Sequence, residues 1–149
     1  MEKVTNNFKE TEQFGFVLAK EILEEKNGNE HAIILTLKGS LGAGKTTFIQ
    51  GFAKGLGVKQ KVLSPTFIIF NKYPLKGNRF KNFYHFDCYR IENEQEIINL
   101  GFEDIISDKK NIVCIEWPEK IKKSLPLNCT SLAFKILKED KRKINYGKR

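Results

Sequence analysis

Apolar residues recur along this chain with two periods, one typical of helices and one typical of strands. Phe14, Leu18 and Ile22 follow helical spacing, and Thr11 precedes them as the expected N-cap of a helix that ends near residues 27–29. Two more helices are expected over 45–56 and 94–100. Short β-rich runs predict strands over 32–37, 67–73, 80–87, 112–116, 132–137 and 142–146.

Turn residues between these strands indicate how the sheet is built. Residues 76–78 (Lys-Gly-Asn) and the KEDK run at 138–141 each separate two strands and predict two antiparallel hairpins. The runs at 32–37 and 112–116 are apolar enough for buried parallel strands. We therefore expect an α/β domain with a mixed sheet. No Pro/Gly/Ser linker divides the sequence, so residues 1–149 are predicted to form a single domain.

The composition excludes several classes of protein. The 149 residues are 40% hydrophobic and 30% charged, which is typical of a globular chain. The longest apolar runs span only four residues, whereas a membrane helix needs about twenty, so we expect no membrane segment. The three cysteines show no Cys-x-x-Cys spacing, which favours structural thiols in a reducing cytoplasm over disulfides or zinc.

The net charge of +8 is unevenly distributed. Residues 59–86 contain six positive side chains and no acid, residues 120–149 contain ten against two, and residues 92–119 contain eight acids against two lysines. Basic blocks raise the hypothesis of nucleic-acid binding. However, 22 of the 26 cations are lysines, whereas base recognition favours arginine. A solvated lysine-rich surface is therefore the simpler interpretation, and both stay open.

Residues 39–46 read Gly-Ser-Leu-Gly-Ala-Gly-Lys-Thr, a complete G-x-x-x-x-G-K-[ST] motif between a predicted strand and a predicted helix. Its glycines let backbone N–H groups point at phosphates, and the helix N-terminus adds partial positive charge. Lys45 is expected to reach the β- and γ-phosphates, and the Thr46 hydroxyl to bind Mg²⁺. The predicted nucleotide-binding residues here are Gly39, Leu41, Gly42, Ala43, Gly44, Lys45, Thr46 and Thr47.

A magnesium ion at Thr46 needs an acidic partner at the end of a neighbouring strand, and two residues qualify. Glu116 ends the apolar run IVCIE, although Trp117 and Pro118 follow it, so it can instead cap the next turn. Asp87 ends a run whose alternation predicts a half-exposed strand, and it can instead be a solvated carboxylate or a cap. The residues alone leave both assignments open.

Other segments refine the expected chemistry. Guanine recognition commonly uses Asn/Thr-Lys-x-Asp, and the nearest match, at residues 71–74, lacks the acid, so ATP is favoured over GTP. Thr66, about 20 residues beyond Lys45, fits either a switch that senses the γ-phosphate or an ordinary Ser-Pro turn. His85 is expected to be a satisfied strand residue and Trp117 a core residue.

Taken together, five segments occur in the order and spacing of one family. The chain resembles the TsaE family, small bacterial P-loop ATPases required for tRNA threonylcarbamoyladenosine biosynthesis, over roughly residues 8–146. The segments that carry the resemblance are GSLGAGKTT (39–47), SPTF (64–67), YHFDCYR (84–90), INLGFEDI (98–105) and IEWPEK (115–120).

This resemblance implies a P-loop NTPase-like three-layer fold, in which a parallel core is flanked by antiparallel strands. It also implies weak ATP hydrolysis that depends on TsaD and TsaB partners, with ATP and Mg²⁺ as cofactors. Direct and indirect contact with tRNA both stay open. Lys45 would hold phosphate, Thr46 and Glu116 would bind Mg²⁺, and Asp87 would lie near the γ-phosphate. Thr66 would belong to a switch-like loop. Residues 8–11 match loosely and would touch adenine, and residues 138–144 match only in character.

The mechanism that follows is a hypothesis in which nucleotide turnover resets the partners between rounds of tRNA modification. The chain itself offers no nucleophile or acyl site for transferring the threonylcarbamoyl group. Two alternatives remain. A small P-loop kinase would pass phosphate to a metabolite, and a basic nucleic-acid-binding ATPase would bind tRNA without a partner and lose affinity steeply with salt.

Overall fold

Seven strands form one sheet in the computed structural model, which describes residues 1–65 and 67–148. The strands are β1 (Glu2–Thr5), β2 (Ile33–Lys38), β3 (Phe70–Pro74), β4 (Asn82–Asp87), β5 (Asn111–Glu116), β6 (Thr130–Lys138) and β7 (Lys141–Lys148). The helices are α1 (Phe8–Glu24), α2 (Lys45–Gly55), α3 (Gln95–Ile98), α4 (Phe102–Ser107) and the 3₁₀ turn η1 (Pro118–Ile121).

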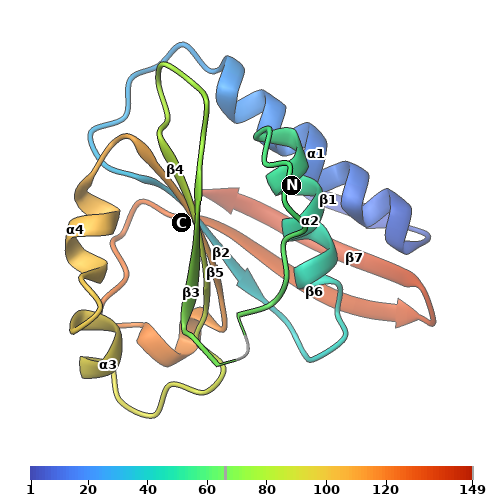
Figure 1. Ribbon diagram of the computed structural model, residues 1–149. Coiled ribbons are helices and arrows are strands. Elements are labelled where there is room, and N and C mark those ends of the chain that lie inside the picture. The colour runs from blue at the N-terminus through green and yellow to red at the C-terminus, as the bar shows by residue number, and fades with distance from the viewer. Residues whose placement is uncertain (66, 149) are drawn as a thin grey trace.

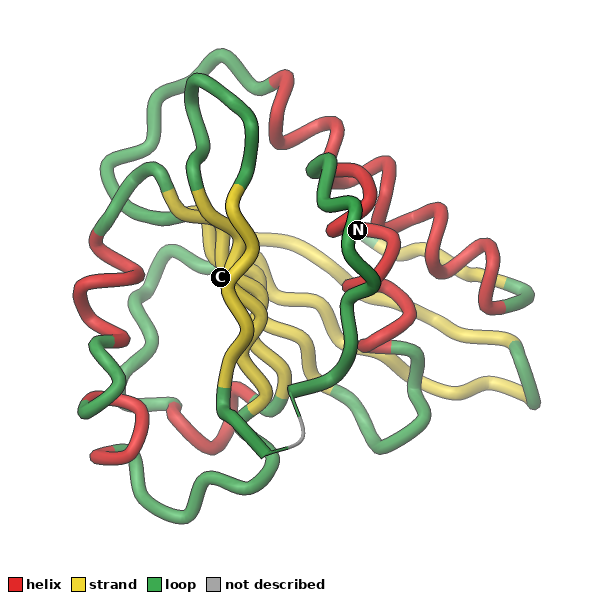
Figure 2. Tube along the Cα trace, in the orientation of Figure 1, coloured by secondary structure: helices red, strands yellow, loops and turns green. Residues whose placement is uncertain are grey.

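The sheet is mixed, as predicted. Its strand order is β1-β7-β6-β2-β5-β4-β3. Strands β6, β2, β5 and β4 run parallel to their neighbours in the centre, whereas β3 pairs with β4, and β7 with β6 and β1, in antiparallel fashion. Figures 1 and 2 show the twisted sheet passing through the middle of the molecule. The two predicted hairpins are thus confirmed, and they flank a parallel core.

Helices cover both faces of this sheet and produce three layers (Figure 1). On one face, Leu35 and Leu37 of β2 share an apolar cluster with Phe48 of α2 and Ala19 of α1. On the other face, Ile34 joins a second cluster that includes residues of α3, α4 and η1. Consecutive residues of β2 therefore bury both faces of the strand, as expected for a parallel strand between two helical layers.

The first helix begins one turn earlier than predicted. Its N-cap is Asn7, whose side-chain oxygen accepts a hydrogen bond from the Glu10 N–H at 2.9 Å, so the assignment of Thr11 as the cap was wrong. Thr11 is instead buried, and its hydroxyl lies 2.7 Å from that of Thr5 in β1. The apolar period starts late because residues 9–13 are all polar, and Phe8 before them is exposed.

The prediction of a half-exposed strand at the end of β4 was also wrong. Phe83, His85 and Phe86 have no exposed surface, because β4 lies between β5 and β3 and has a helical layer on either face. Strand β3 begins at Phe70 rather than at residue 67. Strand β1 and helix α4 were not predicted, and the helix predicted over 94–100 is the shorter α3.

Close packing of α1 on α2 sets the position of the loop before α2. A Cβ atom added at Gly51 of α2 would lie 1.8 Å from the carbonyl oxygen of Glu12 in α1, so only glycine permits this approach. Across the described part of the chain, no helix has the length and apolar character needed to cross a membrane.

The cysteines agree with the prediction of structural thiols. Cys88, Cys114 and Cys129 are buried and take part in no disulfide among the described residues. Burial raises the pKa of the Cys88 and Cys114 thiols, with nearby carboxylates adding to the effect. Both side chains are therefore protonated and unreactive at neutral pH.

Candidate nucleotide-binding site

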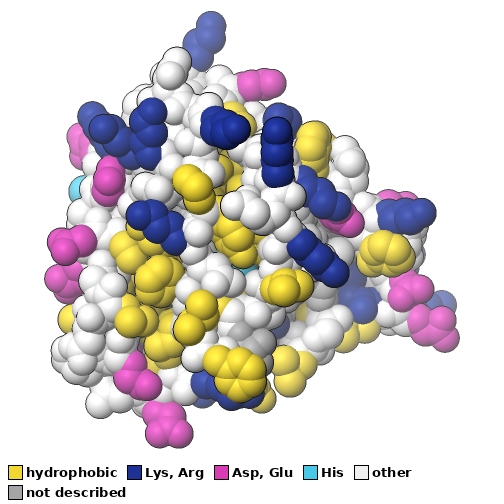
Figure 3. Space-filling view, viewed as in Figure 1, with side chains coloured by type: hydrophobic (Ala, Val, Ile, Leu, Met, Phe, Trp, Pro, Cys, Tyr) yellow, Lys and Arg dark blue, Asp and Glu magenta, His cyan; other side chains and the backbone are white. Residues whose placement is uncertain are grey.

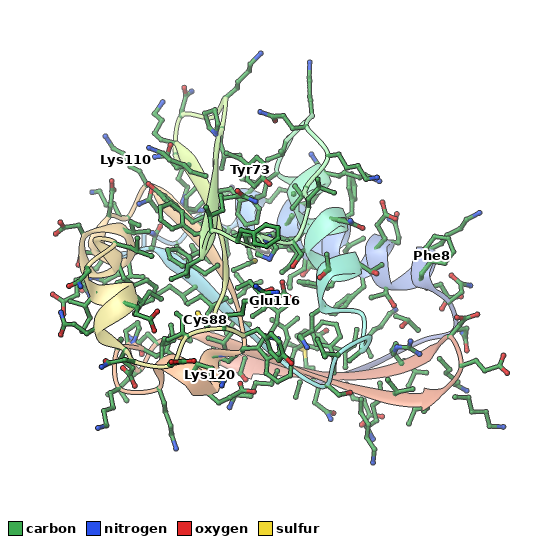
Figure 4. All side chains as sticks on the ribbon, turned by 60° about the horizontal axis from the view of Figure 1, so that its bottom comes forward. Phe8, Tyr73, Cys88, Lys110, Glu116 and Lys120 are labelled. Carbon is green, nitrogen blue, oxygen red and sulfur yellow. The ribbon has the colours of Figure 1, made fainter. Side chains whose placement is uncertain are left out.

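A pocket of about 260 Å³ lies where the carboxyl ends of β2, β4 and β5 meet the beginning of α2. Ligands of open α/β sheets bind at this edge. We call one side of the pocket the inner end, formed by Lys45, Thr46, Asp87 and Glu116. The other side, the outer end, is formed by Phe8, Thr11, Asp140 and Arg142. In Figure 4, Glu116 lies in the interior beside the sheet, whereas Phe8 projects outward from the beginning of α1.

The loop between β2 and α2 has the backbone shape of an anion site. Gly44 is the N-cap of α2 and has a φ of 99°, a left-handed conformation that favours glycine. The first N–H groups of a helix have no acceptor within the helix. Together with the helix dipole they form a site for phosphate. The motif therefore lies between a strand and a helix, as predicted, and its three glycines have positive φ values.

Lys45 is the first residue of α2, and only 4% of its surface is exposed. Its ammonium group donates to the carbonyl oxygens of Gly39 and, at 3.0 Å, Ser40, and lies 4.4 Å from the centre of the Trp117 ring. Burial lowers the pKa of Lys45, while the carboxylates of Glu116, Asp87 and Glu119 act in the opposite direction. The amine is thus held against the loop that precedes α2.

The two candidate acids lie side by side. Asp87 and Glu116 are register partners at the ends of the parallel strands β4 and β5. The Oε1 atom of Glu116 accepts a hydrogen bond from the Thr46 hydroxyl at 3.4 Å, and only 3% of Glu116 is exposed. No side chain caps the following turn η1, so the capping alternative for Glu116 is not observed in the described residues.

Asp87 has a second structural role. Its Oδ2 atom accepts a hydrogen bond from the Ser64 hydroxyl at 3.1 Å, and its Oδ1 atom accepts one from the Tyr89 N–H at 3.0 Å. The second bond holds a local turn rather than a helix N-terminus, because the next helix, α3, has Glu94 as its N-cap, so the helix-cap alternative for Asp87 is not observed in the described residues. The same carboxylate also lines the pocket, so it joins the site to the loops that contain Ser64 and Tyr89.

The residues at the inner end fit a magnesium ion bound together with phosphates. Nowhere in the described residues do three or more His, Cys, Asp or Glu side chains gather as a metal cage. Mg²⁺ does not require one, because it keeps several waters and usually takes one or two protein oxygens plus substrate phosphates. The Thr46 hydroxyl and the Glu116 carboxylate, adjacent in the pocket, are oxygen donors of this kind.

Two residues that were predicted to have only structural roles, His85 and Trp117, lie at the site. His85 is fully buried and its Nε2 atom lies 2.7 Å from Oε2 of Glu116. Trp117 packs partly against the second apolar cluster, as predicted, but it also covers the Lys45 amine and contacts the Tyr89 ring. Its φ of 57° is the sole positive value at a non-glycine residue in the described chain. This strained backbone turns the indole toward the pocket.

The outer end consists of residues that the motif did not indicate. Arg142 of β7 donates to the carbonyl oxygen of Gly42 at 3.1 Å and to that of Glu139 at 2.5 Å, so it ties the β6–β7 turn to the glycine loop. Asp140 lies in the same turn and lines the pocket. The resemblance indicated residues 8–11, but the match at 138–144 was too general to single out Asp140 or Arg142.

The structure brings most of the predicted site residues together. Those that line the pocket are Leu41, Gly42, Ala43, Gly44, Lys45, Thr46, Thr47, Asp87 and Glu116. Gly39 contributes the carbonyl that accepts from Lys45. Thr66 lies outside the described residues. The assignment of these residues to nucleotide, metal and catalysis stays a prediction, although their proximity is a property of the fold.

Comparisons with known proteins agree with this architecture. Residues 5–144 match the family model described as threonylcarbamoyl adenosine biosynthesis protein TsaE. The tRNA threonylcarbamoyladenosine biosynthesis protein TsaE of Bacillus subtilis is 39% identical over 113 residues, covering 76% of this chain and 68% of that protein. The protein of the same name from Treponema pallidum is 28% identical over 147 residues, covering 99% and 100%.

A solved structure shares the fold. The crystal structure of YdiB from Bacillus subtilis superposes with a TM-score of 0.73 at 29% identity, covering 98% of this chain and 83% of that one. The family model, the relatives and the shared fold therefore lead to the same conclusion. The chain belongs to the TsaE family of threonylcarbamoyl adenosine biosynthesis proteins.

Proposed function

We propose that this protein binds ATP with Mg²⁺ and hydrolyses it slowly unless it is stimulated by partners, within the machinery that makes tRNA N6-threonylcarbamoyladenosine. The partners would be TsaD-like and TsaB-like proteins. The observation that carries the proposal is the inner end of the pocket, where a glycine loop, a buried lysine, a hydroxyl and two carboxylates meet at the beginning of one helix.

Each residue of the inner end has a defined task in this proposal. Lys45 exchanges the carbonyl oxygens of Gly39 and Ser40 for phosphate oxygens, which offer it a full negative charge. Thr46 and Glu116 hold Mg²⁺, and the bound ion would neutralise charge on the phosphate oxygens. Asp87 orients the attacking water, since its carboxylate faces the same pocket one strand away from Glu116.

Asp87 also provides a route from the nucleotide to a partner. Its two oxygens bind Ser64 and the Tyr89 N–H, one on each neighbouring loop. A change at the γ-phosphate that moves Asp87 therefore changes both loops. We propose that these loops, 64–67 and 87–90, contact the partner and reset it when ATP is hydrolysed.

An apolar surface beside these loops supports that placement. A second pocket of about 430 Å³ shares Ser64, Asp87 and Tyr89 with the first. Phe67 and Ile68 line it, with 91% and 61% of their surfaces exposed. Figure 3 shows hydrophobic side chains gathered on this face among lysines and arginines. Exposed apolar patches of this kind mark interaction surfaces.

The central test compares two lysines of the same helix. Lys45→Ala is expected to weaken ATP binding about 10- to 100-fold, since charge-assisted hydrogen bonds contribute about 1.5–3 kcal/mol. Threonylcarbamoyl transfer to tRNA by the reconstituted components should then lose multiple turnover. Lys54→Ala, which removes an exposed lysine paired with Glu12, is the matched control and should retain it. Unaltered multiple turnover with Lys45→Ala would refute the proposal.

The basic β3–β4 hairpin keeps a second candidate function open, a nucleic-acid-binding ATPase. Lys72, Lys76 and Lys81 are exposed there and no acid lies among residues 59–86. Such a protein would bind tRNA without a partner, with an affinity that falls steeply as salt rises. A small P-loop kinase would instead release a phosphorylated metabolite rather than inorganic phosphate. Filter binding over a salt series and analysis of the reaction products distinguish these alternatives from ours.

A further inference from the structure

His85 is a polar side chain buried within the sheet. It has no exposed surface, and it lies in the register of β4 opposite Cys114 of β5. Glu116 follows Cys114 by two residues, so its side chain emerges on the same face of the neighbouring strand. This diagonal arrangement places the imidazole Nε2 atom 2.7 Å from Oε2 of Glu116.

The two oxygens of Glu116 therefore have different partners. Oε2 meets His85, whereas Oε1 faces the Thr46 hydroxyl at 3.4 Å. A glutamate side chain has considerable rotamer freedom, which burial and a hydrogen bond restrict. With one oxygen held by His85, the other is directed at the beginning of α2, where the nucleotide would place its phosphates.

The two ring nitrogens of His85 differ in their surroundings. Among the described residues, Nδ1 is buried and has no hydrogen-bond partner. A neutral ring with its proton on Nε2 donates to Glu116 and leaves only a lone pair unmatched, whereas a cationic ring would leave a buried N–H donor unpaired. Within the described part of the chain, the ring nitrogens therefore make one hydrogen bond, to Glu116, and one buried nitrogen stays unsatisfied.

We propose that His85 is a positioning residue for the metal-binding carboxylate. Its Nε2–H would fix Glu116 so that Oε1 and the Thr46 hydroxyl together coordinate Mg²⁺ at the nucleotide site. This inference rests on the proposed function, because it takes Thr46 and Glu116 as the protein ligands of the ion. It assigns to His85 an effect on the Mg²⁺-dependent part of nucleotide binding and none on the phosphate contacts of Lys45.

The test uses two substitutions of similar volume. His85→Gln keeps a donor that can reach Glu116, whereas His85→Met removes it. ADP binding is measured by calorimetry in EDTA and then over a Mg²⁺ series. We expect both variants to bind ADP in EDTA within about twofold of wild type. In His85→Met, the Mg²⁺ concentration that gives half of the Mg²⁺-dependent gain in ADP affinity should rise at least about tenfold. In His85→Gln, this concentration should stay close to that of wild type.

The outcomes separate this role from packing and from the proposed function itself. Equal impairment of both variants would show that the ring acts by packing, and unchanged Mg²⁺ dependence in His85→Met would show no positioning role. Either result overturns the inference while wild type still binds Mg²⁺ and ADP. Wild type that binds no nucleotide would overturn the proposed function and the inference with it. If His85→Met does not fold, His85→Asn, whose shorter amide cannot reach Glu116, replaces it in the same titration.

Discussion

The inner and outer ends of the pocket are built from different parts of the chain. At the inner end, Asp87 and Glu116 are neighbours because β4 and β5 are paired in register, and Lys45 and Thr46 follow β2 directly. At the outer end, Phe8 belongs to the beginning of α1, and Asp140 and Arg142 belong to the last hairpin. Residues more than 125 positions apart therefore share one small surface.

The two ends also differ in the burial of their leading side chains, although Thr11 of the outer end is itself buried. Lys45 and Glu116 are 4% and 3% exposed, whereas Phe8 is 61% exposed. Buried polar groups in fixed positions act strongly on developing charge, since little reorganisation is needed. Exposed side chains at a rim add contact area and affinity. We therefore expect the inner end to control the chemistry of ATP and the outer end to control how tightly its nucleoside is held.

The largest expected effect comes from Asp87 at the inner end. Asp87→Asn removes the charge that would orient water while an amide can still occupy the same space between the loops. We expect hydrolysis in the presence of partners to fall about 100-fold or more, within the range typical of general-base residues, while ADP affinity changes less than about threefold. A phosphate-release assay with calorimetry of ADP binding measures both.

A carboxylate of the outer end provides the matched control. Asp140→Asn should leave the rate of hydrolysis at saturating ATP unchanged, because Asp140 lies in the β6–β7 turn away from β4 and β5. If Asp140→Asn slowed saturated hydrolysis as much as Asp87→Asn, the division of the pocket into two functional ends would be wrong.

The next effect concerns Phe8. Phe8→Ala should weaken ADP binding about tenfold, because an aromatic ring that stacks on a base contributes about 1–3 kcal/mol. Inorganic triphosphate, which lacks the nucleoside, should bind wild type and variant equally. Val17→Ala, another exposed apolar residue of α1, serves as the control. An equal loss of triphosphate affinity would place Phe8 at the phosphates and contradict the comparison.

The same contrast explains what could be predicted from the sequence. The inner end follows from contiguous signals, a glycine loop between a strand and a helix and acids at the ends of apolar runs. The burial of β4 was missed because His85 and Asp87 imitate the alternation of a half-exposed strand, although His85 is buried against Glu116 and Asp87 lines the pocket. Asp140 and Arg142 have no local pattern, since their position depends on how the two ends of the chain pair in the sheet.

A smaller effect is expected where the outer end is attached to the sheet. Thr5 pairs in register with Arg142, and its hydroxyl lies 2.7 Å from that of Thr11. Thr5→Val keeps the shape but removes this buried hydrogen bond. The free energy of unfolding should fall by about 1 kcal/mol. The melting temperature should therefore fall by roughly 3 °C, measured by calorimetry. Val4→Thr on the same strand, where the side chain is exposed, should change it less.

Lys54 should give the smallest effect and the sharpest contrast with Lys45. Both lysines belong to α2, but the Lys54 side chain is 63% exposed and pairs with Glu12 on the surface. Exposed ion pairs contribute about 0.2–1 kcal/mol, so Lys54→Ala should lower the free energy of unfolding by no more than about 0.5 kcal/mol, and less in high salt. Nucleotide affinity should not change, because nine residues, or more than two helical turns, separate it from the glycine loop. A loss of affinity in Lys54→Ala comparable to that in Lys45→Ala would mean that the charge of the whole helix, rather than one buried amine at the inner end, attracts the phosphates.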